Sequence, residues 1–172
     1  MVGRMIGQLA NSIRQHLGVP VTRSLNVVRR LREAGMFPSG GPGRGPEFTR
    51  GDIIALMVAV ATGAKLDDVA AATKATLAAV PGGANLAGAP LTVPRTAEVA
   101  LAVLANQAAD GDDLDELIIE ISHGEPEVAF VWSDGVTQRF QVPGALANHV
   151  PRGRVATRIP GAALASIIRK FK

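Results

Sequence analysis

The stretch that decides the fold is PVTRSLNVVRRLREAGMFPSGGPGRGPEFT, residues 20–49. Its first half combines arginines with apolar residues at helical spacing, and this pattern predicts an amphipathic helix over 23–34. We expect Thr22 to cap that helix and Gly35 to end it, because glycine adopts the left-handed conformation that closes a helix. The predicted buried stripe consists of Leu25, Val28 and Leu31. Glycine and proline dominate residues 39–46, which can form neither a helix nor a sheet ladder, so a loop must follow.

Helical patterns continue on both sides of this stretch. Residues 4–17 form an amphipathic pattern that ends at Gly18. After the loop, Thr49 and Asp52 have the spacing of a capping box and open a helix that Gly63 ends. Two further helices are predicted over 66–79 and 95–109, the latter with Val99, Val103 and Leu104 as its apolar contacts.

The period of the apolar pattern changes in the second half of the chain. The segments LIIEIS (117–122), VAFVWS (128–133) and VTQRFQV (136–142) alternate as strands do, RVATRI (154–159) is a possible fourth strand, and a last helix is predicted over 161–171. Proline and glycine are concentrated in residues 81–94, before these segments. The predicted organisation is therefore a helical domain over 1–80, a linker over 81–94 and an α+β domain over 95–172 with a three- to four-stranded antiparallel sheet and flanking helices.

The Asp134-Gly135 pair predicts a two-residue hairpin turn between the last two central strands. Such a turn places Val131 opposite Gln138 and Phe130 opposite Arg139. Large apolar side chains then fall on both faces of the ribbon, and this arrangement predicts a second covering layer or a partner subunit.

Composition and charge exclude several classes of protein. Hydrophobic residues make up 47% of the 172 residues, which excludes a disordered chain. The absence of cysteine excludes disulfides and thiolate metal sites and suits a reducing, cytoplasmic location, and no apolar run is long enough to cross a membrane. Residues 1–50 carry eight arginines against two acids, residues 111–150 carry eight acids against one arginine, and residues 151–172 carry six basic residues and no acid. This layout predicts a polyanionic partner, or contact between the acidic middle of one subunit and a basic end of another.

The polar residues of the predicted helix over 23–34 have a spacing that places them on one side of the helix. Arg23, Asn26 and Arg30 stand at i, i+3 and i+7, opposite the apolar stripe, with Arg29 beside them. A helix in the DNA major groove needs this arrangement, because Arg bonds to guanine, Asn bonds to adenine and neighbouring arginines take phosphates. Arg44 lies between glycines in the loop, where it can enter a narrow minor groove. The alternative is a solvated, arginine-rich surface that complements the negative end of the helix.

The residues LGVP at 17–20 resemble the turn of the helix-turn-helix family, and REAGMFP followed by a GRG-containing loop is similar to winged DNA-binding proteins of phages and prophages. The resemblance covers residues 4–50 and implies a helix-turn-helix-like N-terminal domain. It makes the helix over 23–34 the reading helix and Arg44 the wing. The candidate DNA-contacting residues are Arg23, Ser24, Asn26, Arg29, Arg30, Arg44 and Arg50.

We therefore expect a sequence-specific duplex DNA-binding protein, a phage- or prophage-type transcriptional regulator that forms homo-oligomers and offers its C-terminal domain to a protein partner. One alternative is the small terminase subunit of a phage, which recognises DNA for packaging. A second is a protein-binding inhibitor or assembly module whose acidic strands mimic nucleic acid. No catalytic residues, metal site or cofactor is expected, because His16, His123 and His149 lack metal-ligand spacing and no nucleophile motif is present.

Overall fold

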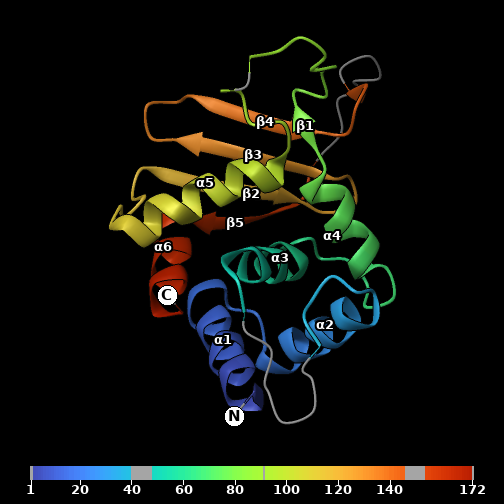
Figure 1. Ribbon diagram of the computed structural model, residues 1–172, viewed down its shortest axis with the longest axis vertical. Coiled ribbons are helices and arrows are strands. Elements are labelled where there is room, and N and C mark those ends of the chain that lie inside the picture. The colour runs from blue at the N-terminus through green and yellow to red at the C-terminus, as the bar shows by residue number, and fades with distance from the viewer. Residues whose placement is uncertain (1, 40–47, 91, 146–153, 172) are drawn as a thin grey trace.

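The computed structural model describes residues 2–39, 48–90, 92–145 and 154–171, which form an α+β fold (Figure 1). The N-terminal helices are α1 (Val2–Leu17), α2 (Val21–Glu33), α3 (Arg50–Ala61) and α4 (Val69–Leu77). The remaining elements are β1 (Val80–Pro81), α5 (Ala97–Asp110), β2 (Leu117–Ser122), β3 (Glu127–Trp132), β4 (Thr137–Gln141), β5 (Ala156–Pro160) and α6 (Gly161–Lys170). The predicted fold class is confirmed, and β1 is a short additional strand.

Helix α3 is the centre of the structure. It is apolar on all sides, and every residue from Ile53 to Ala61 is buried. Figure 1 shows it between the α1–α2 pair and the sheet. The predicted capping box is confirmed: the Thr49 side chain accepts from the backbone N–H of Asp52, and the Asp52 carboxylate accepts from the backbone N–H of Thr49 at 2.7 Å. Because α3 has no exposed face, α1 and α2 must cover its outer side.

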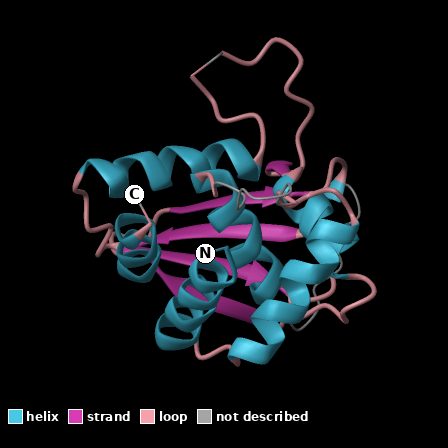
Figure 2. Cartoon of the chain, turned by 60° about the horizontal axis from the view of Figure 1, so that its bottom comes forward, coloured by secondary structure: helices cyan, strands magenta, loops and turns pink. Residues whose placement is uncertain are grey.

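The sheet is antiparallel throughout, in the order β1-β4-β3-β2-β5. One face packs against the helices, and Figure 2 shows the helices in front of it. The buried side chains of this face are Leu117, Ile119, Ile121, Val128, Phe130, Phe140 and Ile159. The opposite face carries Glu120, Glu127, Arg139 and Arg158, as the alternation of side chains along a strand requires.

The β3–β4 hairpin corrects the predicted register by one residue. Its loop has three residues, Ser133 to Gly135, because Trp132 receives a hydrogen bond from Gly135 at 3.0 Å and donates one to Val136 at 2.9 Å. Gly135 has φ +88°, the left-handed residue of a bulged three-residue loop. Phe130 therefore faces Gln138, and Val128 faces Phe140.

This register places the large aromatic side chains on one face. The rings of Phe130 and Phe140 meet edge to face at 5.5 Å, on the side that the helices cover. A shift of one residue exchanges the two faces of a strand. The reason for expecting a second covering layer or a partner subunit on the other face is thereby removed.

The segment 81–94 does not separate two cores. Its first residue, Pro81, pairs with Phe140 as part of β1, and Ala97 just after it donates a backbone hydrogen bond to Ala79 at 2.8 Å. The buried apolar residues of α1 to α4 and those of α5, α6 and the sheet form one cluster. The predicted helical domain and α+β domain are therefore two halves of one packed unit.

Helix α5 differs from its predicted packing. Leu104 is buried as expected, but Val99 and Val103 are exposed, because the buried side of α5 consists mainly of alanines that let the helix approach the core closely. In the part of the chain that the structure describes, no helix has the length and apolar character needed to cross a membrane.

Candidate nucleic-acid interface

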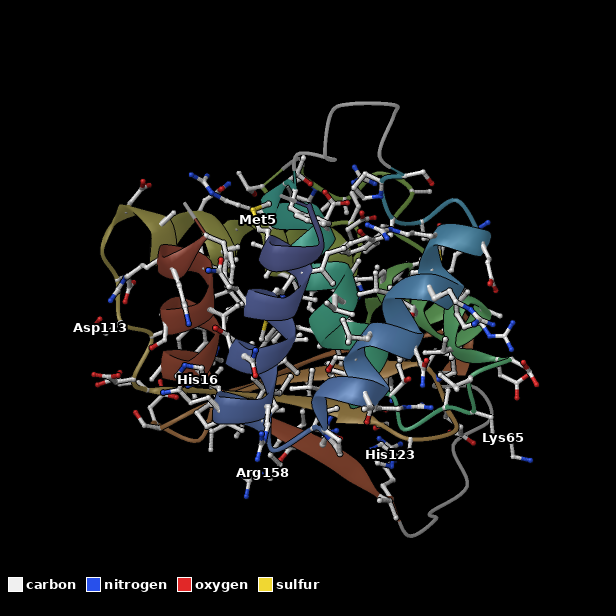
Figure 3. The ribbon with its side chains drawn as sticks, turned by 90° about the horizontal axis from the view of Figure 1, so that it is seen from below. Met5, His16, Lys65, Asp113, His123 and Arg158 are labelled. Carbon is white, nitrogen blue, oxygen red and sulfur yellow. The ribbon has the colours of Figure 1, made fainter. Side chains whose placement is uncertain are left out.

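Helix α2 lies on the outside of the helical half, one short turn after α1. Gly18 ends α1 with φ +72°, and Pro20 takes the N-cap position of α2. Proline fits there because its fixed φ suits the start of a helix, and Thr22, predicted as the cap, instead lies in the first turn. Helix α1 packs against α2 across this turn. Figure 3 shows the two helices side by side on this surface.

The buried stripe of α2 fixes which side faces outward. Val27, Val28 and Leu31 are buried together with Ser24, whereas Leu25, a member of the predicted stripe, is 40% exposed. The helix is thus rotated relative to the prediction. Its exposed face, which we call the α2 face, consists of Thr22, Leu25, Asn26, Arg29 and Glu33.

Two of the predicted DNA-contacting arginines join α2 to the loop between α3 and α4. Arg23 donates to the carbonyl oxygen of Ala64, and Arg30 donates to the Asp67 carboxylate at 2.6 Å. Arg30 also bonds to Glu33 at 3.0 Å. Arg23 and Arg30 therefore flank the α2 face and position the helix rather than project from it.

Arg29 projects furthest into solvent. Its side chain is 70% exposed, and its Nε atom donates to Glu33 at 3.1 Å. The hydrogen bond from Arg30, followed by the charges of both arginines, holds the pKa of the Glu33 carboxyl below its ordinary value. An exposed ion pair of this kind contributes little free energy, so a phosphate or a base edge can replace Glu33 as the partner of Arg29.

The remaining predicted contact residues do not lie on the α2 face. Ser24 is fully buried, so its prediction as a contact residue is wrong. Arg50 is directed to α5, where its Nη1 atom donates to Asn106 at 2.9 Å. Arg44 lies outside the described residues. The α2 face therefore contains Asn26 and Arg29 of the predicted set. It adds Leu25, a member of the predicted buried stripe, and Thr22, the predicted cap.

The second basic group, near the C-terminus, is engaged within the protein wherever it is described. Arg154 bonds to Glu127, and Arg158 bonds to Glu120 at 3.1 Å. Arg169 bonds to Asp113 at 2.6 Å, and Lys170 donates to Ser12 at 2.9 Å. Arg152 and Lys172 lie outside the described residues. This group stabilises the fold and offers less free charge than its sequence suggests.

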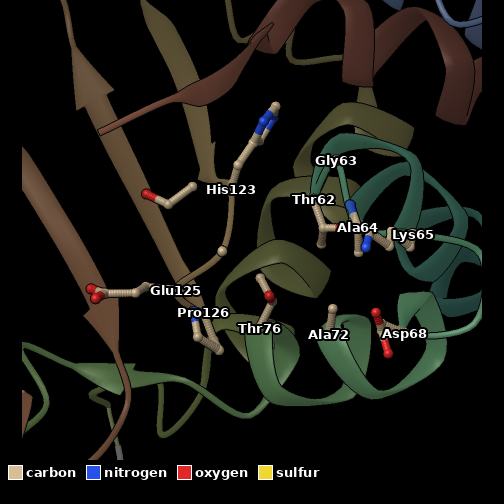
Figure 4. A pocket seen from close by; sticks show the side chains of 12 residues that line it. Thr62, Gly63, Ala64, Lys65, Asp68, Ala72, Thr76, His123, Glu125 and Pro126 are labelled. Carbon is tan, nitrogen blue, oxygen red and sulfur yellow. Dashed lines mark hydrogen bonds between the residues drawn. The ribbon is translucent and has the colours of Figure 1, made fainter. Parts of the chain in front are cut away.

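A pocket of about 370 Å³ lies between the α3–α4 loop, α4 and the β2–β3 turn (Figure 4). His123 lines it from the turn, with its Nε2 atom 2.8 Å from the Thr157 hydroxyl. The ring of His123 covers Gly63, where a Cβ atom would approach Nδ1 to 2.7 Å. Across the described ranges, no three His, Cys, Asp or Glu side chains are grouped to hold a metal ion.

Comparison with protein-family models, with curated proteins and with solved structures finds no match to this chain. The interpretation of the α2 face therefore rests on its own geometry.

Proposed function

We propose that this protein binds duplex DNA through the α2 face and acts as a transcriptional regulator of the phage or prophage type. The observation that carries the proposal is the exposed row Thr22, Asn26 and Arg29 on a short helix whose other side is anchored in the core. A reading helix needs this division, because the anchored side fixes the register and the exposed side meets the base edges.

Each residue of the row has a distinct part in the proposed contact. Asn26 offers the amide that pairs with adenine, and Arg29 offers the guanidinium that pairs with guanine or takes a phosphate. Thr22 stands in the first turn, where unpaired backbone N–H groups favour a phosphate oxygen. The methyl groups of Leu25 can contact a thymine methyl in the same groove.

The arginines around the row supply sequence-independent attraction. This side of the protein carries more arginines than contacting carboxylates. The arginines are Arg23, Arg29, Arg30 and Arg32, and the carboxylates are Glu33 and Asp67. Arg32 is held by the Pro38 carbonyl at 3.2 Å and lies 6.0 Å from the centre of the Phe37 ring. The net positive field draws the DNA backbone to this side, so affinity should fall steeply with salt.

The test is a titration of duplex DNA at two salt concentrations with the wild-type protein, Arg29→Gln and Arg158→Gln. The two arginines are matched: both are exposed and each is paired with one glutamate, but Arg158 lies on the open face of the sheet. We expect Arg29→Gln to weaken binding about ten-fold and to reduce the salt slope by about one, with Arg158→Gln close to wild type.

Equal binding by Arg29→Gln and the wild type would show that the α2 face is not the contact surface. If both variants lose affinity for DNA to the same degree, the overall positive charge of the protein binds DNA, and the α2 face is not a specific site. The mass of the protein in solution tests the proposed role separately, because a dimer fits a regulator and a ring of many subunits fits DNA packaging.

A further inference from the structure

An open apolar groove lies between α5 and the β3–β4 hairpin, on the side of the molecule away from α2. Its volume is about 190 Å³. It is lined by Pro94, Ala100, Val103, Leu104, Gln107, Phe130, Trp132 and Gln138. We call it the α5 groove.

The groove lies beside the first residues of β4, which are exposed, whereas Phe140 and Gln141 at the end of the strand are buried. Helix α6 contacts β2 and β5, and Figure 1 shows α5 in front of the sheet. Val136, just before β4, and Gln138 point to the same face as Trp132 and Phe130, since Val136 stands opposite Trp132 and Gln138 opposite Phe130. Val136 is 57% exposed. A sheet face of this kind is normally covered by a further helix.

Helix α5 adds apolar side chains to the open border of the groove. Val99 and Val103 stand one turn apart, and each is nearly half exposed. With Val136 they make up three of the six exposed large hydrophobic residues in the described part of the chain. Of these three, Val103 lines the groove. Val136 stands opposite Trp132, which also lines it.

The end of the groove at the hairpin turn is acidic. Asp110 lies two turns after Val103 and therefore on the same side of α5. Asp134 is in the hairpin turn, where its carboxylate accepts from the Val136 backbone at 2.9 Å. Ser133 donates to the Glu116 carbonyl at 2.9 Å, which brings Glu116, the last residue of the acidic segment 110–116, against the turn. Of these acids, Asp113 is paired with Arg169.

We propose that the α5 groove docks a basic amphipathic helix of a partner protein. The helix lies beside α5 over β4, its apolar stripe covers Val103, Val136 and Trp132, and its lysines or arginines face the acidic end. This contact covers the exposed start of β4, and the complementary charge fixes the direction of the bound helix. It is separate from DNA binding, because its residues belong to α5 and the hairpin and none belongs to α2.

Trp132 gives a direct readout, because it is the only tryptophan of the chain and the chain has no tyrosine. The probe is an amphipathic helical peptide of roughly 12–15 leucine and lysine residues, without aromatic residues. We expect it to move the emission of Trp132 to shorter wavelength in a saturable titration, as water leaves the indole. A peptide with the same pattern of leucine and glutamate should bind at least about ten-fold more weakly, because its charges meet the acidic end.

Two matched variants locate the contact. Val103→Lys places a positive charge in the groove, and Val155→Lys makes the same change at an exposed valine beside β5. We expect Val103→Lys to raise the dissociation constant of the lysine peptide about ten-fold or more, and Val155→Lys to leave it unchanged. Gln138→Lys tests the floor of the groove in the same way. Thermal unfolding of each variant confirms its fold.

The proposal is overturned if folded Val103→Lys and Gln138→Lys bind the lysine peptide as the wild type does, or if saturation leaves the Trp132 emission unmoved. It is also overturned if both peptides bind equally. A concentration-dependent mass that Val103→Lys abolishes would assign the groove to a second copy of this chain instead. DNA binding by Val103→Lys should equal that of the wild type, so failure here is distinguishable from failure of the proposed function.

Discussion

Two clusters of arginine and glutamate, on the α2 face and on the open face of the sheet, use the same chemistry in opposite ways. At α2, Glu33 is 49% exposed and accepts from Arg29 and Arg30. On the sheet, the Glu127 side chain is only 7% exposed and accepts from Arg139, Arg154 and Gln141. In the first cluster both Arg29 and Glu33 are open to solvent, and in the second the carboxylate is enclosed by its donors.

The comparison shows why charge counted along the sequence is a poor guide to available charge. A buried carboxylate must keep its donors, since an unpaired buried charge costs several kcal/mol. An exposed carboxylate loses little when its arginine turns to another anion, because water replaces the bond. Only the α2 cluster is therefore suited to exchange its internal partner for phosphate.

The largest expected effect is on stability, at the buried cluster. Glu127→Gln removes the charge that Arg139 and Arg154 share, and we expect it to lower the free energy of unfolding by about 2 kcal/mol. For a chain of this size, that loss corresponds to a fall in Tm of about 4–8 °C. Thermal unfolding followed by circular dichroism measures it. Glu33→Gln is the control, and an equal fall in Tm for both variants would contradict the contrast between the clusters.

A smaller effect is expected on DNA affinity, at the exposed cluster. Glu33→Gln frees Arg29 from its carboxylate partner, leaves Arg30 with Asp67, and removes a negative charge beside the proposed contact surface. We expect affinity for duplex DNA to rise about three-fold at low salt, measured by fluorescence anisotropy. Glu98→Gln, which makes the same change in the first turn of α5, should have a lesser effect. Weaker binding by Glu33→Gln would show that Glu33 serves the contact rather than competing with it.

The smallest effect is the titration of Glu33 itself. Because folding lowers its pKa, ionised Glu33 favours the folded state above the ordinary glutamate value, and this contribution is lost as the pH falls through the lowered value. The hydrogen bond from Arg30 is the first cause, so Arg30→Gln should return the pKa towards its ordinary value more than Arg29→Gln does. Carboxyl NMR titration of the two variants checks this order. A larger return in Arg29→Gln would reverse the assignment of causes.

The sequence predicted helix ends and strand bounds well where the deciding interaction joins residues close together in the chain. The capping box of Thr49 and Asp52 opens α3 as expected, and Gly18 ends α1 with a positive φ. The strand 117–122 has its predicted bounds. In each case the deciding interaction joins residues within a few positions of one another, so the pattern of residues contains the whole cause.

Predictions that depend on packing between distant residues were wrong by one residue position. The Asp134-Gly135 pair suits a two-residue turn, yet the hairpin has a three-residue loop, because that register places Phe130 and Phe140 together against the helices. On α2, Leu25 fits the helical stripe, yet Ser24 and Val27 face the core instead. These choices depend on which side α3 and α5 approach, and no local pattern carries that information.

By itself, the sequence determined the fold class, the capping box that opens α3, the glycine that ends α1, and the arginine-rich character of α2. Only the tertiary structure decided that one core joins both halves, that Arg23 and Arg30 position α2 while Asn26 and Arg29 face solvent, and that the first residues of β4 are exposed. The physical reason is that caps and periods act over a few residues, whereas the rotation of a helix and the register of a hairpin are set by the burial of side chains far apart in the chain.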